Sequence, residues 1–303
     1  MEAKFDLVDT ASRSADWVIL GDSSAAHAVR PDVWMAAVPA EVWNLATVAG
    51  LGVTGDVWML DRYLAHSDAP AAVVLMHTVD MWDRAVDPGL AGQVPGSVMR
   101  LVRTRPWPDW SVGAWGQFGL SRYVPLMAES RSLVSSLFGR PLPNGLRFSM
   151  DDRGWVRSRT PDAAQLQRDA QAFATTLASP APPMSADNRQ ALEALGDRCR
   201  SRGIALHVVH APVWQGVEAG MDVHVRSIER QIAQLVEPLD VHFVSRSPGV
   251  AAADLESTVD HLRPEAATDF TLRLVRALEA VTVAPSGVPP AAGATPDGSI
   301  RPR

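Results

Sequence analysis

A serine follows the end of an apolar segment near the start of the chain, in "DWVILGDSSAAHAV" at residues 16–29. The apolar run ends at Leu20, and Gly-Asp-Ser-Ser follows directly at 21–24. Ligands of parallel sheets bind at the carboxyl ends of strands, so Ser23 is placed where a nucleophile could meet a substrate. A serine hydroxyl is a weak nucleophile without a base, so this interpretation needs a histidine from elsewhere. The alternative is that Ser23 only caps the helix that follows.

A histidine in a suitable position lies far downstream, in "TVDHLRPEAA" at 258–267. His261 precedes a helix that we expect to start near Pro264, and it could take the proton of Ser23. Backbone N–H groups at the start of the helix after Ser23 could hold an oxyanion. This pairing predicts attack of serine on an acyl group. His27, one helical turn after Ser23, could also approach the site, with a surface role as the alternative.

Five apolar runs separated by helical patterns predict an α/β fold with a central parallel sheet. The predicted strands are 16–22, 41–48, 71–79, 203–212 and 241–247. The predicted helices lie in 55–67, 185–203 and 264–281. Residues 84–184 interrupt this alternation and are expected to form an irregular insertion or cap. We therefore expect one domain over 1–283, followed by a disordered tail over 284–303 that is rich in proline, glycine and alanine.

Composition excludes several classes of protein. The chain has 303 residues, 47% of them hydrophobic, so it can bury a substantial core. The net charge of −6 argues against nucleic acid as a partner. The single cysteine, Cys199, excludes an internal disulfide and a cysteine-based zinc site. We expect neither a signal peptide nor a membrane span in the given chain, because no segment reaches about 18 consecutive apolar residues.

The two motifs together resemble the SGNH, or GDSL-like, hydrolase superfamily. "ILGDSSAA" is similar to its first block and "DHLRPEAA" to its last. The stretch from "WNLATVAGLGVTG" to "APAAVVL", together with "CRSRGIALHVVHAPV", resembles the branch related to alginate-type polysaccharide O-acetyltransferases. The resemblance implies a flavodoxin-like three-layer sandwich. Its members usually follow a membrane anchor, act on the outer face of the membrane, and transfer or remove acetyl groups of polysaccharides.

The resemblance also implies roles for individual residues. Ser23 would be the nucleophile and His261 the base, while the N–H groups of Ser23 and Gly50 would bind the oxyanion. The family's acid normally lies three residues before the histidine, where this chain has Thr258. Asp260 is the candidate acid, although neighbouring side chains tend to diverge; Asp254 or Glu256 could replace it only if the loop folds back. Val79 stands where the family usually has an oxyanion asparagine.

Two other motifs suggest different chemistry. "GLGVTG" at 50–55 matches the GxGxxG pattern between a strand and a helix, which predicts dinucleotide binding as an alternative. It follows the second expected strand rather than the first, and the hydrolase resemblance also expects a glycine loop here. His207 and His210 invite a metal interpretation, but three residues apart on a strand they point to opposite faces. We therefore expect neither a metal nor a cofactor.

The sequence thus predicts a serine-dependent O-acyl esterase or O-acetyltransferase that acts on a carbohydrate or polysaccharide. Its expected partners are an acyl ester or carbohydrate and, by the resemblance, a membrane-bound acyl-transfer protein. The chain as given would be cytoplasmic, or extracytoplasmic if an anchor has been removed. A catalytically inactive SGNH-like binding or assembly subunit is the second hypothesis, and a dinucleotide-binding enzyme is the third.

Overall fold

The computed structural model describes residues 2–10, 14–96, 110–124, 149–157, 163–214, 222–237, 242–244, 250–255 and 258–283. The tail expected over 284–303 therefore lies outside the described residues. None of the described helices is both long and apolar enough to cross a membrane.

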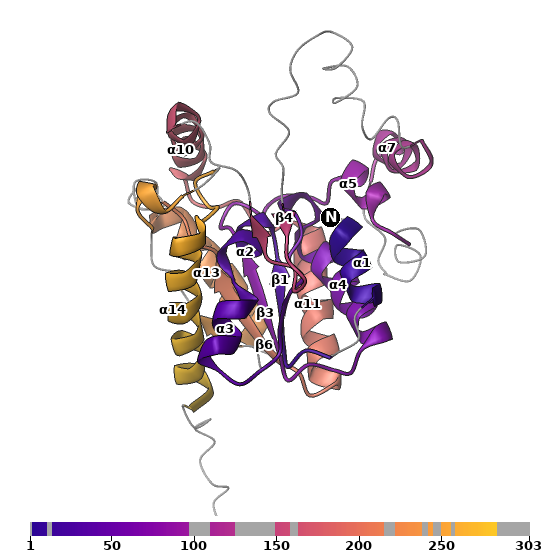
Figure 1. Ribbon diagram of the computed structural model, residues 1–303. Coiled ribbons are helices and arrows are strands. Elements are labelled where there is room, and N and C mark those ends of the chain that lie inside the picture. Colours follow the sequence, from indigo (N-terminus) through magenta and orange to yellow (C-terminus); the bar gives the residue numbers. More distant parts are fainter. Residues whose placement is uncertain are drawn as a thin grey trace, which may run out of the picture.

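Five parallel strands form a central sheet in the order β2-β1-β3-β6-β7 (Figure 1). They are β1 (Trp17–Gly21), β2 (Val42–Asn44), β3 (Ala72–His77), β6 (Ala205–His210) and β7 (His242–Val244). Ile19 of β1 is in register with Asn44 of β2 on one side and with Val74 of β3 on the other. The five predicted strands and the parallel α/β sheet are thus confirmed.

Helices cover both faces of the sheet and complete three layers (Figure 1). One face carries α1 (Glu2–Thr10), α4 (Gly52–His66), α11 (Ala186–Ser201) and α13 (Asp222–Val236). The other carries α2 (Ser23–Ala28), α3 (Pro31–Ala37) and α14 (Pro264–Val283). The predicted helices correspond to α4, α11 and α14, and Ser185 caps α11 as expected.

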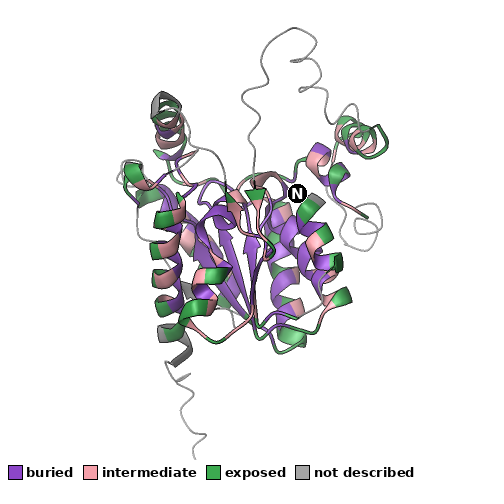
Figure 2. Cartoon of the chain, in the orientation of Figure 1, coloured by how far each residue is buried: buried purple, intermediate pink, exposed green. Residues whose placement is uncertain are grey.

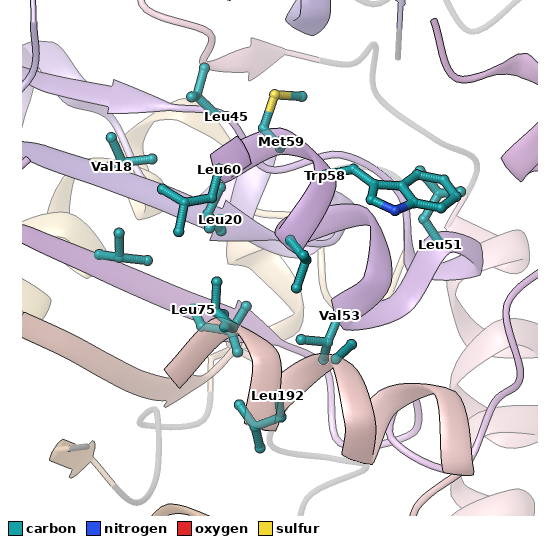
Figure 3. Packing of buried hydrophobic residues seen from close by; sticks show 14 of the residues in the cluster. Val18, Leu20, Leu45, Leu51, Val53, Trp58, Met59, Leu60, Leu75 and Leu192 are labelled. Atoms are coloured by element: carbon teal, nitrogen blue, oxygen red, sulfur yellow. The ribbon is translucent and has the colours of Figure 1, made fainter. Parts of the chain in front are cut away.

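The strands are predominantly apolar because both faces of the sheet are covered by helices. Val18 and Leu20 pack into the core on the α4 side, whereas Ile19 between them packs on the α14 side. Figure 2 shows the sheet buried beneath helices whose outer faces are exposed. Figure 3 shows the α4 side, where Leu20 and Leu75 of the sheet meet Leu60 and Leu192 of the helices.

Residues 84–184 contain regular elements in the part that the structure describes. These are α5 (Pro88–Gln93), α7 (Val112–Tyr123), β4 (Ser149–Met150), β5 (Val156–Arg157) and α10 (Ala163–Leu177). β4 and β5 form an antiparallel hairpin. Trp155, in the turn of this hairpin, donates from Nε1 to the His27 carbonyl at 3.0 Å, so the hairpin lies against α2. The division into one domain and a cap stays a prediction.

Candidate active site at the carboxyl end of the sheet

The turn between β1 and α2 requires glycine at its first position. Gly21 has a φ of 139°, and a Cβ added there would lie 1.8 Å from the carbonyl oxygen of Met76 on β3. Other residues are excluded by both the backbone conformation and the lack of space. Asp22 then caps α2, because its Oδ1 accepts the N–H of Ser24 at 3.0 Å. The glycine and the acid of the motif therefore have structural roles.

A buried chain of three ionisable side chains, Asp22–His77–Asp56, lies behind this turn. His77 at the end of β3 places Nδ1 3.3 Å from Asp22 Oδ2 and Nε2 2.6 Å from Asp56 Oδ2. Asp22 Oδ2 also accepts the backbone N–H and the hydroxyl of Thr78, and Asp56 Oδ1 accepts the N–H of Gly21 at 2.8 Å. None of the three acidic or imidazole side chains is more than 2% exposed. These three side chains connect β1, α2, β3 and α4 at one point.

Burial and the close contacts shift the pKa values of these three groups. Burial alone would raise the pKa of Asp22, but the hydrogen bond and charge of His77 lower it to about 2. Burial alone would lower the pKa of His77, yet Asp56 and Asp22 raise it to about 9. Burial raises the pKa of Asp56, although His77 opposes this shift. At neutral pH His77 is therefore protonated and Asp22 is ionised.

The two serines of the motif differ in their surroundings. Ser23 is the first residue of α2 and is partly exposed, whereas Ser24 is fully buried. The hydroxyl of Ser24 donates to Asp260 Oδ2 at 2.7 Å, although 236 positions separate these residues. This bond attaches the loop that carries His261 to the first turn of α2. Ser23 alone of the two is partly exposed, so it remains the candidate nucleophile.

Asp260 accepts hydrogen bonds from two hydroxyl groups. Besides Ser24 it is bound by Thr258, whose Oγ1 donates to Asp260 Oδ1. The same Oδ1 lies 3.9 Å from Nε2 of His261, within ion-pair range but longer than a hydrogen bond. The expectation that these neighbouring side chains diverge is therefore not met. The loop turns so that the carboxylate faces both α2 and the imidazole.

His261 is placed against α2 by a second contact. Its ring stacks on that of His27, with 4.1 Å between the ring centroids and 14° between the planes. His27 lies one helical turn after Ser23, so Ser23 and His27 share a face of α2. Burial lowers the pKa of His27, and together with the charges of His261 and Lys4 it brings this pKa to about 2. His27 is therefore neutral, and a surface role for it is excluded because only 2% of it is exposed.

The contacts described for the predicted nucleophile and base run through other residues. Within the described part of the chain, no hydrogen bond joins Ser23 to His261, and the two approach through Ser24, His27 and Asp260. Gly50, the other predicted oxyanion residue, lies in the 3-10 turn η1 (Ala49–Leu51). No hydrogen bond of the described residues links it to the serine turn. The roles of Ser23, His261, Asp260 and Gly50 stay predictions.

The other acids near His261 are engaged elsewhere or undescribed. Asp254 lies in η3 (Ala252–Asp254), and its Oδ2 accepts the N–H of Ala251 at 3.0 Å. Glu256 lies outside the described residues. Val79 is buried among apolar side chains. Asp80 next to it is 8% exposed, and burial raises its pKa although Arg84 opposes this. Asp260 is thus the carboxylate that the described structure brings to His261.

The glycine loop has no accessible phosphate cradle in the described structure. Gly52 has a φ of 54°, and a Cβ there would lie 2.3 Å from Oδ1 of Asn188. That oxygen accepts the N–H of Val53 at 3.0 Å, and residues 51–60 are all buried. A dinucleotide pyrophosphate needs such an N–H at a helix start, and here a protein side chain already binds it. The dinucleotide alternative therefore gains no support from this loop.

The two strand histidines point to opposite faces. His207 stacks on Trp17 with centroids 5.6 Å apart, whereas Nε2 of His210 lies 4.0 Å from Glu229 on α13. The described residues contain no group of three or more His, Cys, Asp or Glu side chains that could hold a metal ion. These histidines pack inside the fold, as their spacing predicted.

Sequence reasoning missed His77 and Asp56, and it missed the contact between Ser24 and Asp260. A signal was present for the first two. Asp56 interrupts an apolar helical segment and His77 ends a continuously apolar strand. A polar side chain at a position that is expected to be buried needs a hydrogen-bond partner inside the protein. No comparable signal marked Ser24, because its partner lies in a loop at the far end of the chain.

Comparison with known proteins adds little to this geometry. No family model matches the chain, and no curated protein matches it either. Among solved structures, one described as a lipolytic protein of the G-D-S-L family from Desulfitobacterium hafniense is similar. It is 11% identical with a TM-score of 0.39, and the alignment covers 86% of this chain and 98% of that chain. At this level of similarity, the match says nothing about the activity of this chain.

Proposed function

We propose that this protein is a serine-dependent O-acyl esterase or O-acetyltransferase with Ser23 as nucleophile and His261 as base. The hydrogen bond between Ser24 and Asp260 carries this proposal. It ties the histidine loop to the residue next to a partly exposed serine at the carboxyl end of β1. In parallel α/β folds, substrates bind at the carboxyl ends of the strands.

The reaction would proceed in two balanced steps. His261 takes the hydroxyl proton of Ser23 as its Oγ attacks the acyl carbon of an ester. The C–O bond to the alcohol breaks, and that alcohol leaves with the proton from His261. Water or a sugar hydroxyl then gives a proton to His261 and attacks the acyl carbon, the bond between this carbon and Ser23 Oγ breaks, and His261 returns the proton to Oγ. For this proton transfer, Oγ of Ser23 and a ring nitrogen of His261 have to come within about 3 Å of each other.

Supporting groups are proposed for the charges that develop. Asp260, 3.9 Å from His261 Nε2, would stabilise the imidazolium. The N–H groups of Ser23 and Gly50 would bind the oxyanion. The N–H of Ser24 is not available for this, because Asp22 accepts it. The sequence resemblance, rather than the geometry, supports an acetylated carbohydrate as substrate and a membrane-bound acyl donor as partner.

A second function is favoured by one feature of the site. Both oxygens of Asp260 accept hydroxyl hydrogen bonds, and neither forms a hydrogen bond of normal length to His261. A catalytic acid normally binds its histidine directly. The second candidate is therefore a catalytically inactive relative that binds carbohydrate or assembles with a polysaccharide-modifying complex.

Turnover of p-nitrophenyl acetate tests the first proposal against the second. The wild type should hydrolyse the ester above the buffer rate, and Ser23→Ala should not. Ser67→Ala is the matched control, because Ser67 follows the C-terminus of α4, at the amino ends of the strands. This variant should retain wild-type activity. Equal rates for wild type and Ser23→Ala on every acetyl ester tested would reject catalysis and favour the inactive relative.

A further inference from the structure

His77 is connected to the turn that carries Ser23 through two carboxylates. Its Nδ1 faces Asp22 at 3.3 Å and its Nε2 faces Asp56 at 2.6 Å. Asp22 holds the N–H of Ser24, and Asp56 holds the N–H of Gly21. The imidazole thus links the carboxylates that bind the backbone on either side of Ser23.

We propose that His77 is a positioning residue for acyl transfer: it holds Asp22 and Asp56 in place and thereby fixes the backbone turn from which Ser23 reacts. This inference rests on the proposed function. His77 is fully buried, so it touches neither the substrate nor the reacting atoms. It acts only through the turn.

The charge of Asp22 explains why the turn depends on His77. A buried carboxylate is stable only when it is paired and hydrogen-bonded. Asp22 accepts two backbone N–H groups and one hydroxyl, all of them neutral donors. Among the groups that lower its pKa, His77 comes first. Without that cation Asp22 would take up a proton or move toward water, and in either case its bond to Ser24 would weaken.

Asp56 keeps the imidazole charged and oriented. It binds Nε2, so Nδ1 is directed at Asp22 and both ring nitrogens carry protons. The charged groups that act on His77 are Asp22 from the turn and Asp56 from α4, and Trp82 meets the ring edge-on at 5.6 Å between centroids. Loss of the His77 proton at alkaline pH should therefore release the turn.

Steady-state kinetics of His77→Gln test this role. Glutamine keeps a donor near Asp22 but loses the charge. We expect kcat for p-nitrophenyl acetate to fall about 10- to 100-fold with KM little changed, as for a small displacement of a reacting group. His207→Gln is the matched control, because His207 is an equally buried histidine on neighbouring β6 that packs on Trp17. It should keep kcat within about twofold of the wild type.

The pH profile separates positioning from a general loss of stability. Wild-type kcat, corrected for spontaneous hydrolysis, should decline near pH 9, and His77→Gln should lack this decline. Asp56→Asn removes one carboxylate that raises the pKa of His77, so it should move the decline to lower pH. This variant decides the question if His77→Gln fails to fold.

The outcomes distinguish this inference from the proposed function. If the wild type is active but His77→Gln and His207→Gln share its kcat, the positioning role is wrong and the proposed function stands. An alkaline decline that Asp56→Asn leaves in place would also overturn the role. If the wild type shows no Ser23-dependent activity, the proposed function fails and the inference fails with it.

Discussion

Two hydrogen-bonded regions meet at Ser23, and they differ in how firmly they are held. Behind the serine, the Asp22–His77–Asp56 chain is almost inaccessible to water and binds four elements of the fold. In front of it, the loop with Asp260 and His261 is tied to α2 by one serine hydroxyl and one ring stack. In the first region carboxylates bind an imidazole at close range, whereas in the second the hydrogen bonds to Asp260 come from neutral hydroxyl groups.

Because of this difference, we expect substitutions in the first region to lower stability and substitutions in the second to lower activity. Charges buried in the first region are costly to leave unpaired, so changes there should destabilise the fold. The second region is partly open, with side-chain exposures of 18% for Asp260 and 10% for His261. Changes there should reduce activity while the protein stays folded.

The largest effect is expected for Ser23→Ala and His261→Ala. Each should reduce turnover of p-nitrophenyl acetate to the buffer rate, a loss that reaches about a millionfold in a well-studied serine protease. The double variant should be no worse than either single one, because the two residues act as a unit. A double variant that is clearly slower than both would show that they act independently.

Asp22→Ala should have the largest effect on stability. It leaves His77 without one of its two buried carboxylates, which typically costs about 3–5 kcal/mol of unfolding free energy. Urea denaturation measures this loss. Asp32→Ala is the control, because it breaks only a surface pair with Arg30 and should cost about 1 kcal/mol or less. Equal losses of unfolding free energy for both variants would show that the buried contacts of Asp22, His77 and Asp56 stabilise the protein no more than a surface ion pair does.

Alkaline pH should weaken the first region selectively. The pKa of His77 is raised from 6.5 to about 9, so its contribution to stability is complete below pH 6.5 and is lost as pH rises to about 9. Burial lowers the pKa of Lys4 from 10.5 to about 7, which gives the opposite slope between those values. Subtracting the stability curve of His77→Gln from that of the wild type removes the Lys4 contribution.

The difference curve should therefore fall by up to about 3 kcal/mol across this range, since each unit of pKa shift corresponds to about 1.4 kcal/mol. Urea denaturation at pH 6, 7, 8 and 9 provides the curve. A difference that is flat or rises with pH would show that His77 is neutral in the folded protein.

Asp260→Ala should give the smallest of these effects. Asp260 is not hydrogen-bonded to His261, so its removal should cost activity roughly 10- to 100-fold, less than the about 10⁴-fold seen when an intact triad loses its acid. The unfolding free energy should fall by only about 1 kcal/mol, for the lost bond to Ser24. If Asp260→Ala is as inactive as His261→Ala while still folded, Asp260 is a full triad acid.

The fold could be predicted from the sequence because its signals are local. Each strand lies in a predominantly apolar run, and α11 begins at a capping serine. Helix α1 was not predicted, since only Phe5 and Val8 mark the face that it buries. Helix α13 was also missed, although Ile228 and Ile232 lie one turn apart. The apolar stripe of α1 is short, whereas that of α13 also includes Val225 and Val236 and extends over three turns.

The site could be predicted only in part, because its contacts join distant segments. Ser23 and His261 were chosen from motifs, but no pattern within either motif shows that Ser24 binds Asp260. The contact of Asp260 with His261 depends on the backbone path of a short loop, which adjacent positions do not specify. Long-range geometry of this kind requires the assembled sheet edge.

Labelling with a fluorophosphonate probe tests the central claim most directly, because such probes react only with an activated serine hydroxyl. Intact-mass measurement and peptide mapping would locate the adduct. The account predicts one adduct, on Ser23 and not on buried Ser24, that is absent in Ser23→Ala and strongly reduced in His261→Ala. An unlabelled wild type, or labelling that persists in Ser23→Ala, would contradict the assignment of Ser23 as an active nucleophile.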